Sequence, residues 1–117
     1  EFVIVDAAMN DLIRPALYSA WQNIIPVKLQ SQADENTWDI VGPVCETGDF
    51  LGKERPLRLR ENDLLAIRSS GAYGFSMSSN YNSRPRPPEV MVDGARPCLI
   101  RERESVESLF ASERLLP

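Results

Sequence analysis

The sequence predicts a mainly β domain, a Greek-key sandwich or barrel with a few short helices. Two observations indicate this class: about six or seven short runs of β-forming residues recur at the spacing of hairpins, and glycine or proline separates most of them. A length of 117 residues suits one modest domain with a single core. We therefore expect residues 1–117 to form one β-domain.

The first half of the chain is predicted to hold three strands. Residues 2–5 are a continuous apolar run of β-formers, typical of a buried strand. Residues 21–29 alternate loosely, with Pro26 at an edge or a bulge. After a polar turn at 31–36, residues 37–44 form the third strand. Because a core strand starts almost at the first residue, we expect the chain to be a piece of a longer protein.

A short helical turn is expected near Pro15, with Asn10 or Asp11 as its cap. Arg14 and Tyr18 are four residues apart and would share one face of this turn. A guanidinium beside a phenol is a good receptor for a carboxylate, because the fork gives two parallel bonds and the hydroxyl a third. The alternative is an arginine paired with a local aspartate and a tyrosine packed in the core.

The second half begins with a short alternating piece at 57–59, a turn at 61–63 and a core strand at 64–67. The following segment is rich in small residues, and Tyr73 would project from its tightest point. The alternative is a glycine-rich corner in which Tyr73 and Phe75 are core aromatics. An extended, proline-rich connector follows.

The chain is expected to close with a hairpin and a helix. Residues 89–92 and 98–100 read as two strands joined through Asp93 and Gly94, a strong hairpin signal. Ser105 can cap a last short helix. The apolar face of that helix would consist of Val106, Leu109 and Phe110.

Composition narrows the function. The net charge is −4 and the arginines are scattered among acidic residues, which argues against a nucleic-acid partner. No apolar run approaches the roughly 20 residues of a membrane span, so no membrane partner is expected. Cys45 and Cys98 are the only cysteines, which favours a reducing, cytoplasmic setting.

The sequence lacks the residues that several kinds of catalytic or binding site require. The chain has no histidine, which excludes a histidine-based triad and the common zinc sites, so we predict no metal. Its two lysines, Lys28 and Lys53, lie in no apolar setting that would suit a Schiff base. A glycine-rich phosphate loop is also missing from the sequence. The chain therefore looks like part of an active site.

The loop at 42–49, with the sequence GPVCETGD, is the strongest candidate site. Pro43 and Gly48 break the preceding strand pattern, which places Cys45 and Glu46 at a turn. A strand can aim such groups while the loop keeps them accessible, and a thiol beside a carboxylate can relay protons. The alternative is a tight turn with an ordinary exposed cysteine.

Five segments together resemble one family. These are VDAAMNDLIRPALY at 5–18, GPVCETGD at 42–49, GAY at 71–73, SNYNSRP at 79–85 and LIRERE at 99–104. In this order, and over nearly the whole chain, they resemble the C-terminal domain of the diaminopimelate decarboxylase family. The first segment is the most specific, whereas the cysteine segment is shared with related amino-acid decarboxylases.

The resemblance implies a pyridoxal-phosphate (PLP) enzyme of lysine biosynthesis that converts meso-diaminopimelate to L-lysine. It implies a homodimer, with a separate α/β barrel that carries the Schiff-base lysine and that this chain lacks. Arg14 and Tyr18 would hold a substrate carboxylate, and Glu46 would contact the distal amine. Cys45 would donate a proton in the partner subunit's site, and Tyr73 would meet the cofactor phosphate and the substrate. The chain alone would be inactive.

The chemistry of these residues suits that reaction. PLP serves as an electron sink when a carboxylate leaves, and a thiol can then supply the proton. Thr47, where serine is more usual, is a conservative departure from the family. Two alternatives stay open: a related PLP decarboxylase acting on ornithine, arginine or carboxynorspermidine, and a non-catalytic β-sandwich interaction module. Substrates such as ornithine have no distal carboxylate for Arg14 and Tyr18.

Overall fold

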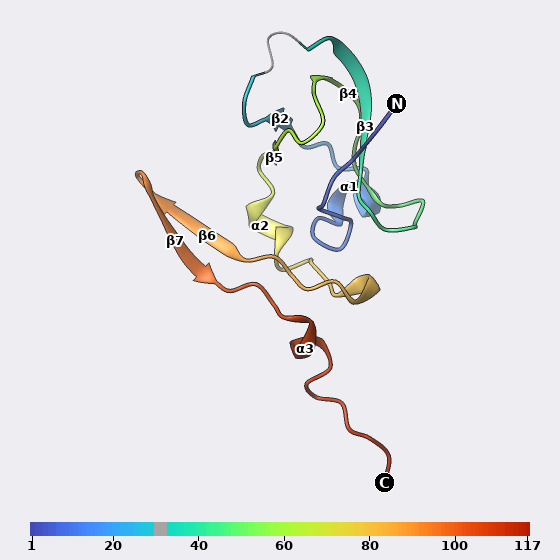
Figure 1. Cartoon of the computed structure of the whole chain (residues 1–117), viewed down its shortest axis with the longest axis vertical. Coiled ribbons are helices and arrows are strands. Elements are labelled where there is room, and N and C mark those ends of the chain that lie inside the picture. Colours follow the sequence, from blue (N-terminus) through green and yellow to red (C-terminus); the bar gives the residue numbers. More distant parts are fainter. Residues whose placement is uncertain (30–32) are drawn as a thin grey trace.

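A computed structural model describes residues 1–29 and 33–117 and consists mainly of strands with short helices (Figure 1). The strands in these residues are β1 (Phe2–Ile4), β2 (Ile24–Pro26), β3 (Glu35–Val41), β4 (Phe50–Arg58), β5 (Leu65–Ile67), β6 (Glu89–Asp93) and β7 (Arg96–Arg101). The helices are α1 (Arg14–Tyr18), α2 (Gly71–Gly74), the 3-10 turn η1 (Tyr81–Ser83) and α3 (Val106–Leu109). The mainly β prediction is confirmed.

The strands form three small sheets in the described residues. The first has the order β1-β3-β4, and β2–β5 and β6–β7 form two separate pairs. β1 runs parallel to β3, with Val3 opposite Ile40, and the other pairs are antiparallel. None of these sheets closes on itself within the part of the chain that the structure describes.

The core lies between the first sheet and the β2–β5 pair. Ile40 and Leu51 are each only 1% exposed, and Leu12, Ile24 and Leu57 complete the buried cluster. The prediction that residues 2–5 form a buried strand is half right. β1 is a strand, but it is an edge strand and its residues alternate in direction, so Val3 packs on the core while the residues on either side are exposed.

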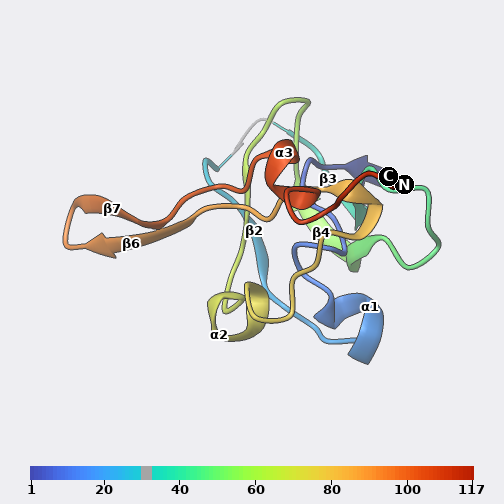
Figure 2. The ribbon, with the colours of Figure 1, turned by 90° about the horizontal axis from the view of Figure 1, so that it is seen from below.

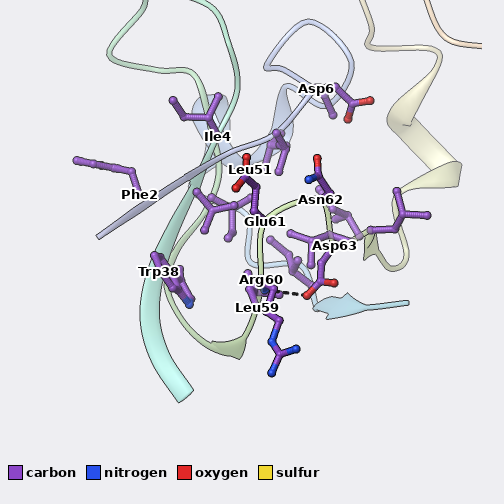
Figure 3. Close-up of a pocket in the computed structure, with 18 residues that line it drawn as sticks. Phe2, Ile4, Asp6, Trp38, Leu51, Leu59, Arg60, Glu61, Asn62 and Asp63 are labelled. Atoms are coloured by element: carbon purple, nitrogen blue, oxygen red, sulfur yellow. Dashed lines mark hydrogen bonds between the residues drawn. The ribbon is translucent and has the colours of Figure 1, made fainter. Parts of the chain in front are cut away.

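A groove of about 750 Å³, lined by apolar residues and by the polar turn at 60–63, opens beside β1 (Figure 3). Phe2 and Ile4 lie along one side, and Trp38 on β3 also lines it. The turn at 60–63 forms another wall, where the Arg60 backbone N–H donates to the Asp63 carboxylate at 2.8 Å. None of the five predicted site residues lines this groove.

The hairpin of β3 and β4 is longer than predicted. In the second strand of this hairpin, only the short piece at 57–59 is predicted from the sequence, whereas β4 starts at Phe50. Its middle, GKERP, has few β-formers, but β4 is the outer strand of its sheet, so Pro56 breaks no second ladder. Glu54 adopts a left-handed φ of 52° where the pairing with β3 shifts register.

Other boundaries shift for local reasons. α1 confirms the helical turn, but Ile13 is its N-cap and Asp11 instead accepts the Ala8 backbone N–H at 2.9 Å. The strand expected at 21–29 shortens to β2, and the core strand expected at 64–67 is β5, which is half-buried. The turn predicted at 31–36 begins outside the described residues, and β3 starts within it.

The β6–β7 hairpin, called the arm below, projects from the rest of the molecule in both views (Figures 1 and 2). Both its strands and the turn at Gly94, with φ +60°, agree with the prediction. Nearly all its side chains are exposed. Ser105 caps α3 as predicted, because its hydroxyl accepts the Ser108 backbone N–H at 3.2 Å.

Candidate functional site

Residues 42–49, called the cysteine loop below, connect β3 to β4. Asp49 fixes this loop from inside and is only 4% exposed. One of its carboxylate oxygens accepts the Val44 backbone N–H and the other accepts the Met9 backbone N–H, each at 2.7 Å. A side chain at Gly42 would collide with the same carboxylate. The loop is therefore tied both to itself and to the turn near Met9.

The tip of the cysteine loop presents Cys45 and Glu46, and both are exposed. The Tyr81 hydroxyl donates a hydrogen bond to Glu46 Oε1. This hydrogen bond, reinforced by the negative charge of Glu46, raises the pKa of the Tyr81 phenol above its ordinary value. The thiol is thus accessible, and the carboxylate beside it is held by a residue far away in the sequence.

A second cluster forms around Arg14. Its guanidinium carbon lies 5.4 Å from the centre of the Tyr18 ring and 5.0 Å from that of the Tyr73 ring. One guanidinium nitrogen of Arg14 donates to the Met77 sulfur at 4.0 Å. Packing against rings leaves the other N–H donors at the edge of the guanidinium for an anion. The structure thus brings Arg14, Tyr18 and Tyr73 together, whereas Cys45 and Glu46 lie on the cysteine loop.

The geometry disagrees with the alternative interpretations, in which Arg14 pairs with a local aspartate and Tyr18 and Tyr73 are core aromatics. Tyr18 and Tyr73 are 59% and 57% exposed, so neither is a core aromatic. Asp11, the aspartate just before this helix, lies 3.7 Å from the Arg84 guanidinium. Phe75 is half-buried and its ring packs under the Arg101 guanidinium at 4.0 Å. Tyr73 stands on α2, a helical turn that the sequence did not predict.

Two residues of this region received no role from the sequence. Asp49 belongs to the predicted loop motif without a role of its own, although aspartate side chains commonly hydrogen-bond nearby backbone groups in turns. Tyr81 gave no signal, because its partner Glu46 lies 35 positions away. Only the fold brings Tyr81 to the cysteine loop.

Metal and cofactor binding depend on the donors present. Among residues 1–29 and 33–117, no three Asp, Glu, Cys or His side chains gather as metal ligands. For a phosphate-bearing cofactor, the chain offers the exposed Tyr73 hydroxyl. Lys28 and Lys53 are both exposed, and the Lys53 ammonium lies 4.1 Å from the Phe50 ring. The described residues therefore offer a hydroxyl for such a phosphate and no buried lysine for a Schiff base. No described helix is long and apolar enough to cross a membrane.

The fold and these clusters define a sheet domain whose surface carries side chains of the kinds found in active sites. Residues 1–71 match the family model described as the pyridoxal-dependent decarboxylase, C-terminal sheet domain. Because this match covers more than half of the chain, the chain belongs to that family.

Similar proteins agree with this assignment. The chain is 66% identical over all of its 117 residues to a diaminopimelate decarboxylase of Vibrio cholerae, and 60% identical to one of Pseudomonas aeruginosa. It spans 28% of the length of each of these relatives. A crystal structure of diaminopimelate decarboxylase from M. jannaschii in complex with L-lysine matches 99% of the chain and 26% of its own length, with 42% identity and a TM-score of 0.92.

Proposed function

We propose that the chain is the C-terminal domain of a diaminopimelate decarboxylase and that the longer protein converts meso-diaminopimelate to L-lysine and carbon dioxide. The rest of that protein would supply an α/β barrel with the cofactor lysine, and two subunits would form a homodimer. The names of the relatives support this reading. The free, exposed Cys45 and Cys98 suit a reducing, cytoplasmic setting.

The contact of Arg14 with two tyrosine rings carries the proposal. A diaminopimelate-like substrate has a carboxylate and an amine at the end away from the reaction. The guanidinium edge and the Tyr18 hydroxyl suit that carboxylate, and Glu46 suits the amine. Ornithine and arginine lack the second carboxylate and would leave Arg14 without a ligand.

The remaining residues act at the reacting end of the substrate. When bound, PLP would supply an electron sink for the bond to the departing carboxylate. Cys45, reaching into the partner subunit's site, then gives its thiol proton to the carbon that lost carbon dioxide. The Tyr73 hydroxyl would donate to the cofactor phosphate. Arg14 and Glu46 fix which end of the substrate faces the thiol.

Arg14→Ala in the longer protein tests this assignment. Losing a charge-assisted, two-pronged contact should raise KM for diaminopimelate roughly ten- to a hundredfold and leave the melting temperature nearly unchanged. Arg68→Ala, at an exposed position outside the cluster, is the matched control. Unchanged KM with a collapse in thermal stability would make Arg14 a structural residue.

A mixed dimer tests the role of Cys45. Cys45→Ala should reduce kcat about a hundredfold or more with PLP content unchanged, the scale expected when a general acid is removed. A dimer of one Cys45→Ala subunit and one subunit without the barrel lysine should keep one working site. That site combines the lysine of the first subunit with the thiol of the second. A mixed dimer as inactive as both parents would refute the shared site.

We also propose that the longer protein closes the groove beside β1, which would complete the sandwich or barrel. The apolar residues along one side of the groove and the exposure of Phe2 and Ile4, at 71% and 72%, support this. The chain alone should then bind an apolar dye that the longer protein excludes.

The chain alone should also form no borohydride-trappable adduct with PLP at Lys28 or Lys53.

A further inference from the structure

The turn at 8–11 holds two loops that come from distant parts of the sequence. The Met9 backbone N–H donates to the Asp49 carboxylate at 2.7 Å and so anchors the cysteine loop. The next residue, Asn10, is 2% exposed, and its carbonyl accepts the Ser79 backbone N–H at 2.9 Å. The Asn10 side-chain amide donates back to the Ser79 carbonyl at 3.4 Å. Adjacent residues of one turn therefore fix the start of the 79–84 segment next to the cysteine loop.

The backbone of the 79–84 segment is held in an unusual conformation around Tyr81. Asn82 and Ser83 both adopt left-handed conformations, with φ of 59° and 54°. Such strain persists only where the surrounding structure determines it, and it concentrates at functional positions. Here the Asn80 side-chain amide bridges the Arg84 carbonyl at 3.1 Å and the Glu104 carboxylate at 2.6 Å.

The far end of the same segment is fixed to the N-terminal region. The Arg84 guanidinium donates to the Asp6 carbonyl at 2.6 Å and lies 3.7 Å from the Asp11 carboxylate. Tyr81 therefore stands on a segment tied at both ends. Its hydroxyl reaches Glu46 while its side chain stays 47% exposed, so burial does not explain its position.

We infer that Tyr81 is a positioning residue that orients the Glu46 carboxylate toward the amine at the distal end of the substrate. The inference rests on the proposed function, in which Glu46 binds that amine. The hydroxyl occupies Oε1 and leaves Oε2 as the acceptor for an ammonium group. Without this bond, an exposed glutamate on a loop tip would sample several rotamers and would bind the amine less well.

The electrostatics agree with this role. The hydrogen bond to Glu46 raises the pKa of Tyr81, so the phenol remains a donor through the neutral and mildly alkaline range. An ammonium arriving at Oε2 adds a positive charge and leaves the phenol–carboxylate bond in place. The two donors would thus share one carboxylate without competing for one oxygen.

Inhibition of the longer protein by two ligands tests the inference. L-Lysine carries the distal carboxylate and amine, whereas 6-aminohexanoate is the same molecule without that amine. Tyr81→Phe should raise the inhibition constant of L-lysine about three- to tenfold, the range for one lost hydrogen bond, and change that of 6-aminohexanoate less than about twofold. Glu46→Gln, measured in parallel, should show the same selectivity with a larger effect.

The pattern across the two variants separates the possible failures. If Glu46→Gln weakened lysine binding and Tyr81→Phe left it unchanged, the role of Tyr81 would be overturned and the proposed function would stand. No effect in Glu46→Gln would overturn the assignment of Glu46, and the inference with it. Equal weakening of both ligands in Tyr81→Phe would show a general structural role and would also overturn the inference.

Discussion

The body of the molecule, β1–β5 with α1, differs from the arm in what its strands pack against. Both regions have apolar β-formers on regular strands. In the body, Ile40 and Leu51 are 1% exposed, whereas Val92 and Leu99 in the arm are 65% and 60% exposed. Pairing and a good turn define the two strands of the arm, but a lone hairpin is only marginally stable in water, and burial requires a second layer of structure. The difference teaches that strand formation and burial must be predicted separately.

The largest expected effect compares one leucine in each region. Leu51→Ala removes a fully buried side chain and should destabilise the 117-residue chain by about 2–5 kcal/mol. Leu99→Ala on β7 should change the free energy of unfolding by about 0.5 kcal/mol or less. Urea unfolding followed by circular dichroism measures both. Equal losses would mean that the arm packs against something in solution and would remove the contrast.

A second comparison concerns acidic residues. Asp49→Ala leaves the Met9 and Val44 backbone N–H groups without their acceptor, so we expect a loss of about 2–4 kcal/mol. Glu102→Ala, at an exposed position just past the arm, is the matched control and should be nearly neutral. If Asp49→Ala were as mild as the control, water would have to replace the carboxylate, and the loop would not depend on it.

Two glycines give a smaller contrast. A methyl group at Gly42 would collide with the Asp49 carboxylate, and Gly42→Ala should cost about 1–3 kcal/mol. Nothing lies within 4 Å of the corresponding position at Gly71 in α2, where alanine also favours the helix. Gly71→Ala should therefore be neutral or slightly stabilising in thermal melts. The reverse order would contradict the close packing inside the cysteine loop.

The smallest effect concerns Glu104, which ties the segment after the arm to the residues before it. Hydrogen bonds from the Arg86 backbone N–H and then from Asn80 hold the pKa of Glu104 below its ordinary value of 4.5. Because the pKa of Glu104 is lower in the folded state, its ionised carboxylate stabilises the fold fully above pH 4.5. This contribution disappears as the pH falls through the folded-state pKa. Glu104→Gln should therefore flatten the acid side of the stability profile. An unchanged profile would show that these bonds do not persist.

The strands and turns with local signals were predictable from the sequence. The hairpin at Asp93 and Gly94, the cap at Ser105 and the turn containing Pro15 all appear as expected. Most of β4 was missed because its pairing with β3, not its composition, makes it a strand. The exposure of Phe2 was missed because an apolar run does not reveal whether a second layer covers it.

The candidate site also combines contacts that follow from local sequence with contacts that only the fold creates. Arg14 and Tyr18 are neighbours on α1, so their contact follows from helical spacing. Their contact with Tyr73 depends on how α2 is placed, which no local pattern encodes. The partnership of Tyr81 with Glu46 likewise requires the turn at 8–11, whose anchoring bonds join residues 40 and 69 positions apart.

The shared anchoring of two loops by the turn at 8–11 also constrains how this domain can be re-engineered. The groups that support the loops are Met9, Asn10 and Asp49, whereas the exposed groups stand at the tips. A designer could exchange the tip residues 45–47 for another sequence and keep the frame. Exchanging the whole cysteine loop would remove Asp49 and release the loop from Met9. Transplants should therefore be cut inside the anchors, between residues 44 and 48.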